Sequence, residues 1–503
     1  MENIQYLLQG FHTAITFQNI IAALFGGIMG LVVGAMPGLG SLTGVALLLP
    51  LTFKMEPTTG IIMLAAIYYA NMFGGSFSAI LLNIPGDSPA VMTALDGYEL
   101  TQKGKAGKAL FAANISSFVG GTIGIILLTL IGPALARVGL AFGPAEQAAL
   151  ILFALTSIGW LLGDDPLKGL LTTTFGLLLA TVGVDQQLGQ IRFTFGSVNL
   201  LSGISFIPLV IGMFGFSQVM DMMINRPDSG SLAATKLTIK ESLLTGKEIK
   251  SILPTIFRGG FLGNFVGLLP GAGATTASFF SYILEKKVGK KPEMLGKGSL
   301  NGVAAAETAN NSAAAGAFAP LLALGIPGSG TAAVLLGGLM MWGLRPGPLL
   351  FTEEPDFVWG LISSMYIGNI ICIFIALAMI PFVINILRIP LSILTPIVAM
   401  VCIVGSYSVN NSMFDVWFMI FAGVIAYLFN SYNYPVAPLL LAFVLTPRLE
   451  QATRQAFELS NGSVDIFLKS PIAVTFLAAI VLFTIVPIFM KKFGKKKNSP
   501  GNA

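Results

Sequence analysis

Four short stretches of the chain combine proline, glycine and a residue with a side-chain oxygen. They are MPGLGS (36–41), NIPGDS (83–88), LPGAGATT (269–276) and GIPGSGT (325–331). Proline lacks the N–H group that continues a helix, glycine permits a sharp turn, and Ser, Thr or Asp can cap the next helix. Each stretch is therefore expected to end one helix and begin another, whose first amides have no intrahelical partner.

Helix starts of this kind can bind an anion. Their unpaired amides and the positive end of the helix dipole attract carboxylate or phosphate. Several together would hold an anion without a buried arginine, and Lys54, Arg258 and Arg345 all lie beside expected loops. The residues expected to bind the anion are Pro37, Gly38, Gly40, Ser41, Pro85, Gly86, Ser88, Pro270, Gly271, Gly273, Thr275, Pro327, Gly328, Ser329 and Thr331.

Close packing is the alternative explanation of these stretches. Gly and Pro are more frequent in membrane helices than in soluble ones, and small residues let such helices approach each other. A single stretch would favour this explanation. Four stretches at matching positions favour a binding site instead.

The NIPGDS and GIPGSGT stretches also differ from each other. Asn83 and Asp87 of the former stand where the latter has Gly325 and Ser329. A carboxylate beside a helix start repels a bound anion, whereas a hydroxyl can donate a hydrogen bond to it. We therefore expect an asymmetric site in which GIPGSGT is better suited to an anion.

A second polar group lies in the segment AETANNSAAAG. Its Glu307, Asn310 and Asn311 are three and four residues apart, so they share one face of the expected helix. Asn71 lies in the segment YYANMFGGS, which matches this region but has no carboxylate. Carboxylate and amide oxygens can hold Na⁺, and a carboxylate can carry a proton. These four residues are expected to bind a coupling cation, although hydrogen bonds between helices would explain each one alone.

The composition indicates a membrane protein. Of 503 residues, 54% are hydrophobic and only 10% are charged, and the mean hydropathy is +0.82. Apolar runs such as 116–136, 357–387 and 471–490 reach the roughly 20 residues that a helix needs to cross a bilayer. Such runs exclude a β-barrel, whose strands alternate polar and apolar residues. We expect an all-α polytopic membrane protein with roughly 11–13 membrane segments, some of them broken or re-entrant hairpins.

The chain aligns with itself. GLVVGAMPGLGSLTG matches GNFVGLLPGAGATTA, GGSFSAILLNIPG matches GAFAPLLALGIPG, and ISSFVGGTIGIILLTLI matches ISSMYIGNIICIFIALA, in the same order. The sequence therefore predicts two related membrane repeats. The expected divisions are a first repeat at 11–225, a polar cytoplasmic linker at 226–251, a second repeat at 252–450 and an extra transmembrane helix at 471–490.

Basic residues indicate the orientation of these repeats. The linker, the segments 285–298 and 491–497 and the loop QKGKAGK (102–108) are basic. The counterpart of that loop, RPGPLLFTEEPDF (345–357), is mainly acidic. Basic flanks of apolar spans usually lie in the cytoplasm, so an inverted arrangement, with corresponding loops on opposite sides, is favoured over a parallel one.

Enzymes and nucleic-acid-binding proteins fit the sequence poorly. It contains no GxxxxGK[ST], HExxH or CxxC motif, and its serines have no nearby histidine. The basic clusters lack a helix or aromatic platform that could recognise a nucleic acid. We therefore expect no enzyme, no cofactor and no metal other than Na⁺ as a coupling ion.

The ordered motifs resemble one known family. PGLG, GGSFSAILLNIPGDSPAVMTALDGY, LPGAGATTASFFSYILEKK, AAAETANN and LGIPGSGTAAVLLGGLMMWGLRPGPLLF follow one another as in the large membrane subunit of the tripartite tricarboxylate transporters. The resemblance extends over almost the whole chain. The family's glycine and proline motifs fall on Pro37, Gly38, Gly40, Pro270, Gly271, Gly273, Pro327 and Gly328.

This resemblance implies a function and two partners. It implies secondary import of an organic carboxylate, such as citrate or another di- or tricarboxylate, driven by a Na⁺ or H⁺ gradient across the bacterial inner membrane. The implied partners are a small four-helix membrane subunit and a periplasmic solute-binding protein. We expect elevator-like motion of one substructure, with an anion channel and a non-transporting membrane scaffold as the alternatives.

Overall fold

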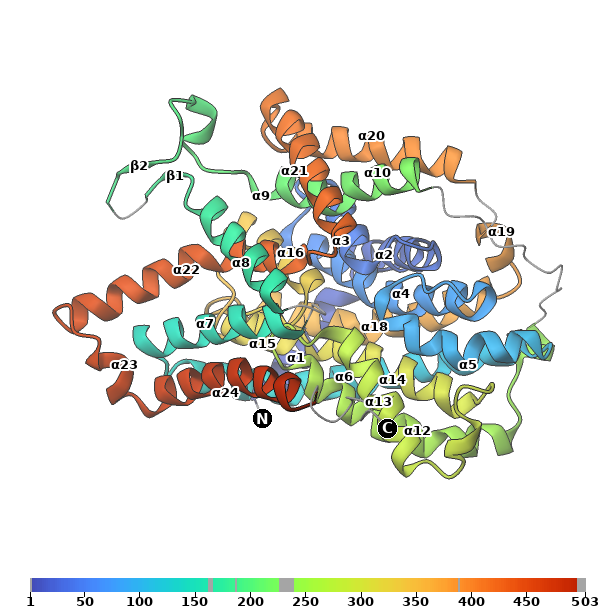
Figure 1. Ribbon diagram of the computed structural model, residues 1–503. Helices are drawn as coiled ribbons and strands as arrows, with labels where there is room; N and C mark the ends of the chain where they lie inside the picture. Colours follow the sequence, from blue (N-terminus) through green and yellow to red (C-terminus); the bar gives the residue numbers. More distant parts are fainter. Residues whose placement is uncertain (1, 162–165, 186–187, 226–238, 388–389, 495–503) are drawn as a thin grey trace, which may run out of the picture. The chain divides into compact units, whose positions relative to one another are not determined.

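The protein is described here by a computed structural model covering residues 2–161, 166–185, 188–225, 239–387 and 390–494. Nearly all secondary structure in these ranges is helical (Figure 1). This confirms the expected all-α polytopic membrane fold. Most of the predicted linker, 226–238, lies outside the described residues, and the chain resumes with α11 (Ile239–Ser242).

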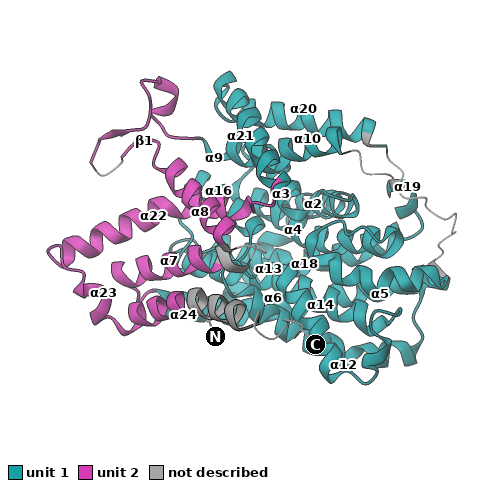
Figure 2. Ribbon diagram, viewed as in Figure 1, with its two compact units in different colours: residues 1–139, 205–431 teal, residues 140–204, 432–503 magenta. Residues whose placement is uncertain are grey.

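The chain forms two compact units, shown in different colours in Figure 2. Unit 1 comprises residues 1–139 and 205–431, and unit 2 comprises residues 140–204 and 432–503. Unit 1 thus contains parts of both predicted repeats. The division into repeats rests on the self-alignment and remains a prediction.

Unit 1 contains the candidate site residues. Its helices before residue 140 are α1 (Glu2–Ala14), α2 (Phe17–Ala35), α3 (Ser41–Leu48), η1 (Leu49–Thr52), α4 (Pro57–Leu82), η2 (Ser88–Ala90), α5 (Val91–Gln102) and α6 (Ala106–Gly139). Those from 205 to 316 are α9 (Phe206–Val210), the π-helical η4 (Ile211–Phe216), α10 (Ser217–Ile224), α11, α12 (Gly246–Gly267), α13 (Gly273–Val288), η5 (Pro292–Met294) and α14 (Leu300–Gly316). The remainder are α15 (Phe318–Leu324), α16 (Gly330–Met341), α17 (Leu350–Glu353), α18 (Pro355–Met379), α19 (Val383–Leu387), α20 (Leu391–Asn410) and α21 (Met413–Ser431).

Unit 2 is a smaller helical bundle with one hairpin. It contains α7 (Pro144–Leu161), α8 (Pro166–Ala180), β1 (Gly183–Val184), β2 (Ile191–Arg192), η3 (Val198–Leu200), α22 (Ala437–Leu459), α23 (Asp465–Lys469) and α24 (Pro471–Gly494). The two strands pair antiparallel, and α22 packs against α7 and α8. The predicted extra helix at 471–490 lies within α24.

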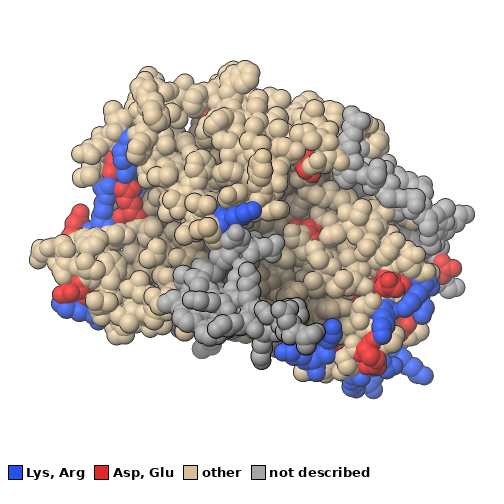
Figure 3. All heavy atoms as spheres, viewed as in Figure 1, with Lys and Arg blue, Asp and Glu red and all other residues tan. Residues whose placement is uncertain are grey.

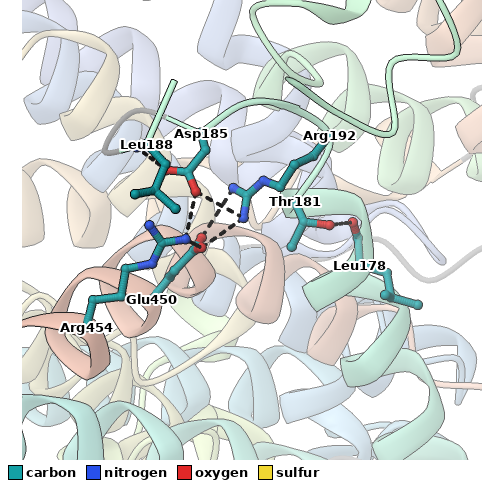
Figure 4. A network of polar contacts seen from close by, with 7 residues as sticks. All are labelled: Leu178, Thr181, Asp185, Leu188, Arg192, Glu450 and Arg454. Carbon is teal, nitrogen blue, oxygen red and sulfur yellow. Dashed lines mark hydrogen bonds and ion pairs between the residues drawn. The ribbon is translucent and has the colours of Figure 1, made fainter. Parts of the chain in front are cut away.

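An ion network fixes the hairpin to α22 within unit 2 (Figure 4). Arg454 Nη2 lies 2.7 Å from Asp185 Oδ2, and Arg192 Nη1 lies 2.8 Å from Glu450 Oε1. Two arginines thus face two carboxylates, so the charges within the network balance. The hairpin is held by these side chains, since its two-residue strands alone would be marginal.

Seven described helices are long and apolar enough to cross a membrane. They are α2, α4, α6, α18, α21, the continuous α9–η4–α10 segment (Phe206–Ile224) and most of α20 (Ser392–Asn410). The apolar run predicted at 357–387 does not form one helix, because α18 ends at Met379, just before Pro381. On the face shown in Figure 3, wide areas of the described surface carry no charged residue, as expected of a surface that contacts lipid.

A column of glycines packs α2 against α4. A Cβ atom at Gly30 would lie 2.5 Å from the carbonyl oxygen of Ile67, and one at Gly34 would lie 2.4 Å from that of Asn71. A real Cβ never approaches an atom so closely, so only glycine permits this separation of the helices. The glycines therefore determine how closely α2 approaches α4.

The aligned glycines of α12 make the corresponding contacts with α14. A Cβ at Gly263 would lie 2.3 Å from the carbonyl oxygen of Ala309, and one at Gly267 would lie 2.4 Å from that of Ala313. Positions that are matched in the self-alignment thus have the same packing role in the two helix pairs.

Candidate functional site

Two tips, defined as residues 83–89 and 325–331, follow α4 and α15. Each helix ends on a residue in the left-handed conformation, Asn83 with φ 58° and Gly325 with φ 68°. Glycine adopts this conformation freely, and asparagine tolerates it better than most residues. The predicted helix breaks at both tips are present in the structure.

A glycine in each tip lies against the chain just before another break. A Cβ at Gly86 would lie 1.9 Å from the carbonyl oxygen of Gly34 in α2, and one at Gly328 would lie 2.8 Å from that of Gly267 in α12. Both tips therefore need glycine at this position for close approach of the backbone. These contacts place each tip beside the end of a helix that leads into another predicted break.

The first tip, 83–89, uses its own carboxylate at a helix start. Asp87 Oδ1 accepts a hydrogen bond from the Ser88 amide at 2.7 Å, and Asp87 Oδ2 accepts one from the Ser41 amide at 2.8 Å. Ser41 is the first residue of α3. The position where a bound anion was expected at the start of α3 therefore contains a protein carboxylate.

The second tip, 325–331, keeps its capping hydroxyl for its own helix. Ser329 Oγ accepts a hydrogen bond from the Ala332 amide at 3.2 Å and shares another with the Tyr68 hydroxyl at 3.0 Å. Among the backbone bonds of α16, the one from Ala333 N to Ser329 O, at 3.0 Å, is the first. The amides of Gly330 and Thr331 precede it and have no intrahelical partner.

Hydrogen bonds connect the four broken stretches. Ser41 Oγ lies 3.0 Å from Thr331 Oγ1, which joins the start of α3 to the start of α16. The Gly271 amide donates to the carbonyl oxygen of Gly328 at 3.1 Å. In addition, Ser278 Oγ of α13 donates to the Pro89 carbonyl oxygen at 2.9 Å. Segments that are far apart in the sequence thus meet in one region of unit 1.

The predicted anion-binding residues differ in exposure within this region. Buried residues are Ser41, Gly86, Pro270, Gly271, Gly273, Pro327, Gly328 and Thr331. Half-buried ones are Pro37, Gly40, Pro85 and Ser329, and exposed ones are Gly38, Ser88 and Thr275. Every stretch thus contributes both a buried residue and a more accessible one.

The predicted cation-binding residues are all buried in helices α4 and α14. Asn311 Nδ2 donates to Asn310 Oδ1 at 2.6 Å and to the Glu307 carbonyl oxygen at 3.0 Å. Neither side-chain amide atom of Asn71 has a hydrogen-bond partner among the described residues, although the residue is 0% exposed. A buried polar group without a partner is unusual, so Asn71 remains a candidate site residue.

Two hydroxyl groups that sequence analysis missed hold the carboxyl group of Glu307. Thr93 Oγ1 of α5 donates to Glu307 Oε1, and Ser117 Oγ of α6 donates to Glu307 Oε2 at 3.0 Å. All three side chains are 0% exposed. In the sequence, the only signal for Thr93 and Ser117 is a hydroxyl residue among small and apolar helix residues. This signal does not identify Glu307 as their partner.

Asp96 is a second buried carboxylate that sequence analysis did not single out. It accepts hydrogen bonds from the amides of Gly296, Gly298 and Ser299 at 2.7–2.9 Å and from the Tyr282 hydroxyl at 2.8 Å. Asp96 lies on α5, whereas its partners lie on α13 and on the loop that precedes α14. Its environment satisfies the carboxylate completely, which indicates a structural role.

The sequence model of the tripartite tricarboxylate transporter TctA family matches residues 20–441. The chain belongs to this family. The site described above thus belongs to a TctA family protein, and this is a family of transporters rather than of enzymes. The resemblance noted in the sequence is confirmed, and the chain is a multi-pass membrane protein.

Two similar proteins of Agrobacterium vitis support the assignment to the TctA family. One, an uncharacterized 52.8 kDa protein in the TAR-I ttuC' 3'region, is 40% identical over 498 residues, which are 98% of this chain and 99% of the relative. The other, an uncharacterized protein in the TAR-II ttuC' 3'region, is 39% identical over 233 residues, 46% of this chain and 96% of the relative. No solved structure matches the chain.

Proposed function

We propose that the protein is the large membrane subunit of a tripartite secondary transporter that imports an organic carboxylate, citrate or another di- or tricarboxylate. Import would be coupled to a Na⁺ or H⁺ gradient across the bacterial inner membrane. A small four-helix membrane subunit and a periplasmic solute-binding protein would be its partners. Membership of the TctA family supports the transporter class, and the remaining parts are our proposal.

The meeting of four broken stretches is the observation on which the proposal rests. Unpaired amides at helix starts suit carboxylate groups, and the amides of Gly330 and Thr331 precede the first intrahelical bond of α16. The hydroxyls of Ser41 and Thr331 lie 3.0 Å apart beside them and can also donate to an anion. We assign the carboxylate to this region, chiefly to the second tip.

The neighbouring buried polar residues would hold the coupling cation. Asn71, Glu307, Asn310 and Asn311 supply amide and carboxylate oxygens, which suit Na⁺ or, at Glu307, a proton. A carrier must bind substrate and cation in linked sites. The tips adjoin the helices that contain these residues, since α4 ends at the first tip and α14 continues through α15 to the second.

Inverted repeats would give this carrier alternating access. The matched glycine contacts of α2 with α4 and of α12 with α14 support two related halves. We propose that the halves have opposite topology and that one substructure moves like an elevator. Cysteines introduced at Lys105 and Glu353 should react with impermeant reagents from opposite sides, and reaction from the same side contradicts this arrangement.

Uptake in membrane vesicles tests the transport function directly. Vesicles containing both membrane subunits and the cognate binding protein should accumulate labelled citrate or another member of a di- and tricarboxylate panel when a Na⁺ or pH gradient is imposed. Vesicles with Gly328→Val should not, because the added side chain displaces the second tip from Gly267. Accumulation without either gradient, or none by the wild type, contradicts the proposal.

Counterflow separates a carrier from the two alternatives. A carrier exchanges external labelled citrate for unlabelled citrate inside the vesicle and transiently concentrates the label. A channel equilibrates the label without concentrating it, and a scaffold moves none. Either of these outcomes overturns the proposed function.

A further inference from the structure

The carboxyl group of Glu307 has hydroxyl partners but no cationic partner among the described residues. Thr93 and Ser117 donate to its two oxygens, and none of the ion pairs in the described part of the chain includes Glu307. An ionised carboxylate at 0% exposure is costly to bury unless a positive charge lies nearby. Burial thus favours a form of Glu307 in which a proton or another cation is bound to the carboxyl group.

Charged groups on the helices packed against α14 are already engaged elsewhere. Arg258 of α12 pairs with Glu285 of α13 at 2.6 Å, and Lys108 of α6 pairs with Glu248 at 2.7 Å. Asp96 of α5 accepts four hydrogen bonds, from the amides of Gly296, Gly298 and Ser299 and from the Tyr282 hydroxyl.

The other titratable residues of these helices do not neutralise Glu307 either. They are Tyr68 and Tyr69 on α4, Tyr98 and Glu99 on α5, Arg137 on α6, Lys247 and Lys250 on α12, and Tyr282, Lys286 and Lys287 on α13. None of them forms a recorded ion pair with Glu307 in the described chain.

The geometry around Glu307 suits a proton better than Na⁺. Ser117 Oγ and Glu307 Oε2 lie 3.0 Å apart, the separation of two oxygens that share a hydrogen atom, and Thr93 lies at least as close to Oε1. Both carboxylate oxygens already accept a hydrogen bond from a hydroxyl group, and a proton can add to either oxygen without displacing that hydroxyl. A hydroxyl group can donate to the ionised carboxylate and can rotate to accept from the protonated one, so the same partners serve both forms.

We propose that Glu307 carries the coupling proton of the transporter, with Thr93 and Ser117 as the residues that position its carboxyl group. This inference rests on the proposed function. A proton from the solution on one side adds to a carboxylate oxygen of Glu307, and it later leaves to the other side. The O–H bond of the carboxyl group forms and later breaks, and the charge of the residue changes accordingly. No bond between heavy atoms forms or breaks.

The position of Thr93 connects this proton to the substrate region. Thr93 lies in the first turn of α5, which directly follows η2 and the first tip. A change in the position of the first tip would therefore move the hydroxyl that donates to Glu307. The substrate region and Glu307 are thus linked through α5.

Infrared difference spectroscopy of the purified protein tests proton binding with H⁺ itself as the probe. Wild-type protein in acidic minus alkaline buffer should show the C=O band of a buried carboxylic acid. Glu307→Gln should abolish this band, and Glu293→Gln, which neutralises an exposed carboxylate, should keep it. Thr93→Val should shift the band, and Thr93→Ser should restore it. A band that persists unchanged in Glu307→Gln overturns the inference.

Citrate transport in vesicles with equal Na⁺ on both sides tests the coupling role. Glu307→Gln should lose at least tenfold of the accumulation driven by a pH gradient but retain citrate counterflow, because exchange requires no net proton movement. Glu293→Gln should retain both. The inference is overturned if Glu307→Gln accumulates citrate at the wild-type level under a pH gradient. It is also overturned if wild-type accumulation is driven by Na⁺ independently of pH and Glu307→Gln loses that accumulation. Absence of both activities from wild-type vesicles contradicts the proposed function instead.

Discussion

The two tips share a backbone path but differ in what their polar atoms bind. Both start from a left-handed residue, and both place a glycine against the end of another helix. In the first tip Asp87 binds the Ser41 amide, whereas in the second Ser329 caps its own helix. The second tip is also the more buried, with Ile326 at 1% exposure and Ile84 only half-buried. The same backbone path therefore accompanies two different helix starts. The start of α3 is bound by the Asp87 carboxylate, whereas the Gly330 and Thr331 amides at the start of α16 have no intrahelical partner.

This difference refines the asymmetry expected from the sequence. From the sequence, Asp87 was expected to cap the helix after its own tip and to make that tip less suited to an anion. The structure shows that it fills the start of α3, in a different stretch. An internal carboxylate can hold α3 in place while the amides at the start of α16 remain available to a substrate.

The largest expected effect on stability comes from replacing Gly86 of the first tip or Gly328 of the second tip by alanine. Gly86→Ala should lower the free energy of unfolding by about 3 kcal/mol and Gly328→Ala by about 1 kcal/mol, because the added Cβ would lie 1.9 Å from a backbone oxygen at Gly86 but 2.8 Å from one at Gly328. Thermal unfolding in detergent measures the difference. Gly246→Ala, where no atom lies within 4 Å, is the control and should be nearly neutral. Equal losses at both tips would contradict this ranking.

The next largest effects are opposite changes in the uptake of the proposed carboxylate substrate. Thr331→Val should raise the KM about tenfold, because the Thr331 hydroxyl is proposed to donate to the substrate and a hydrogen bond to a charged group contributes about 1.5–3 kcal/mol. Asp87→Asn should lower the KM roughly threefold to tenfold, because it removes a like charge worth about 1 kcal/mol or more at short range. The concentration dependence of vesicle uptake measures both, with Glu293→Gln as the surface-charge control. If the KM changes in the same direction in both variants, the second tip is not the one that binds the carboxylate in preference to the first, and the proposal is wrong on this point.

A smaller effect should separate the residues at which the tips begin. Asn83→Gly should leave stability nearly unchanged, whereas Asn83→Ala should cost about 1–2 kcal/mol, because alanine is strained in the left-handed region. Gly325→Ala should cost at least as much, because this residue is buried. Chemical unfolding in detergent provides the measurement. A stable Asn83→Ala protein would show that the first tip can change its backbone conformation.

The smallest effect is a pH dependence outside the tips. Burial alone would raise the pKa of Glu248, but hydrogen bonds from Lys108 and Thr245 outweigh it and lower the pKa to about 2, from an ordinary 4.5. The stabilisation is therefore complete above pH 4.5 and is lost as the pH falls towards 2. Such a partly exposed pair contributes about 0–1 kcal/mol.

Unfolding at several pH values in Glu248→Gln checks this effect. The variant should lose the part of the acid dependence of unfolding that Glu248 causes. An unchanged acid dependence would mean that the Lys108–Glu248 pair does not stabilise the fold.

Local sequence rules predicted a helix break at both tips, from proline, glycine and a capping residue. The structure adds that the breaks begin at Asn83 and Gly325, both in the left-handed conformation. These features depend on a few adjacent residues, so a single sequence contains the information. The same applies to the membrane helices, which apolar length alone indicates.

Pairings between distant segments could not be predicted in this way. Asp87 binds an amide 46 residues earlier, and Thr93 binds a carboxylate 214 residues later. A sequence gives the residue types of such partners but not their separation in space. The compact units also cross the repeat boundaries, since they depend on packing between segments that periodicity does not relate.

The buried carboxylate of Asp96 limits which parts of unit 1 can move during transport. It joins α5, from the predicted first repeat, to three amides of the 296–299 loop, from the predicted second. Separating them would leave a buried charge without its donors, at a cost of several kcal/mol. A moving substructure of the kind proposed would therefore keep α5 and the 296–299 loop together, and its hinges would lie elsewhere.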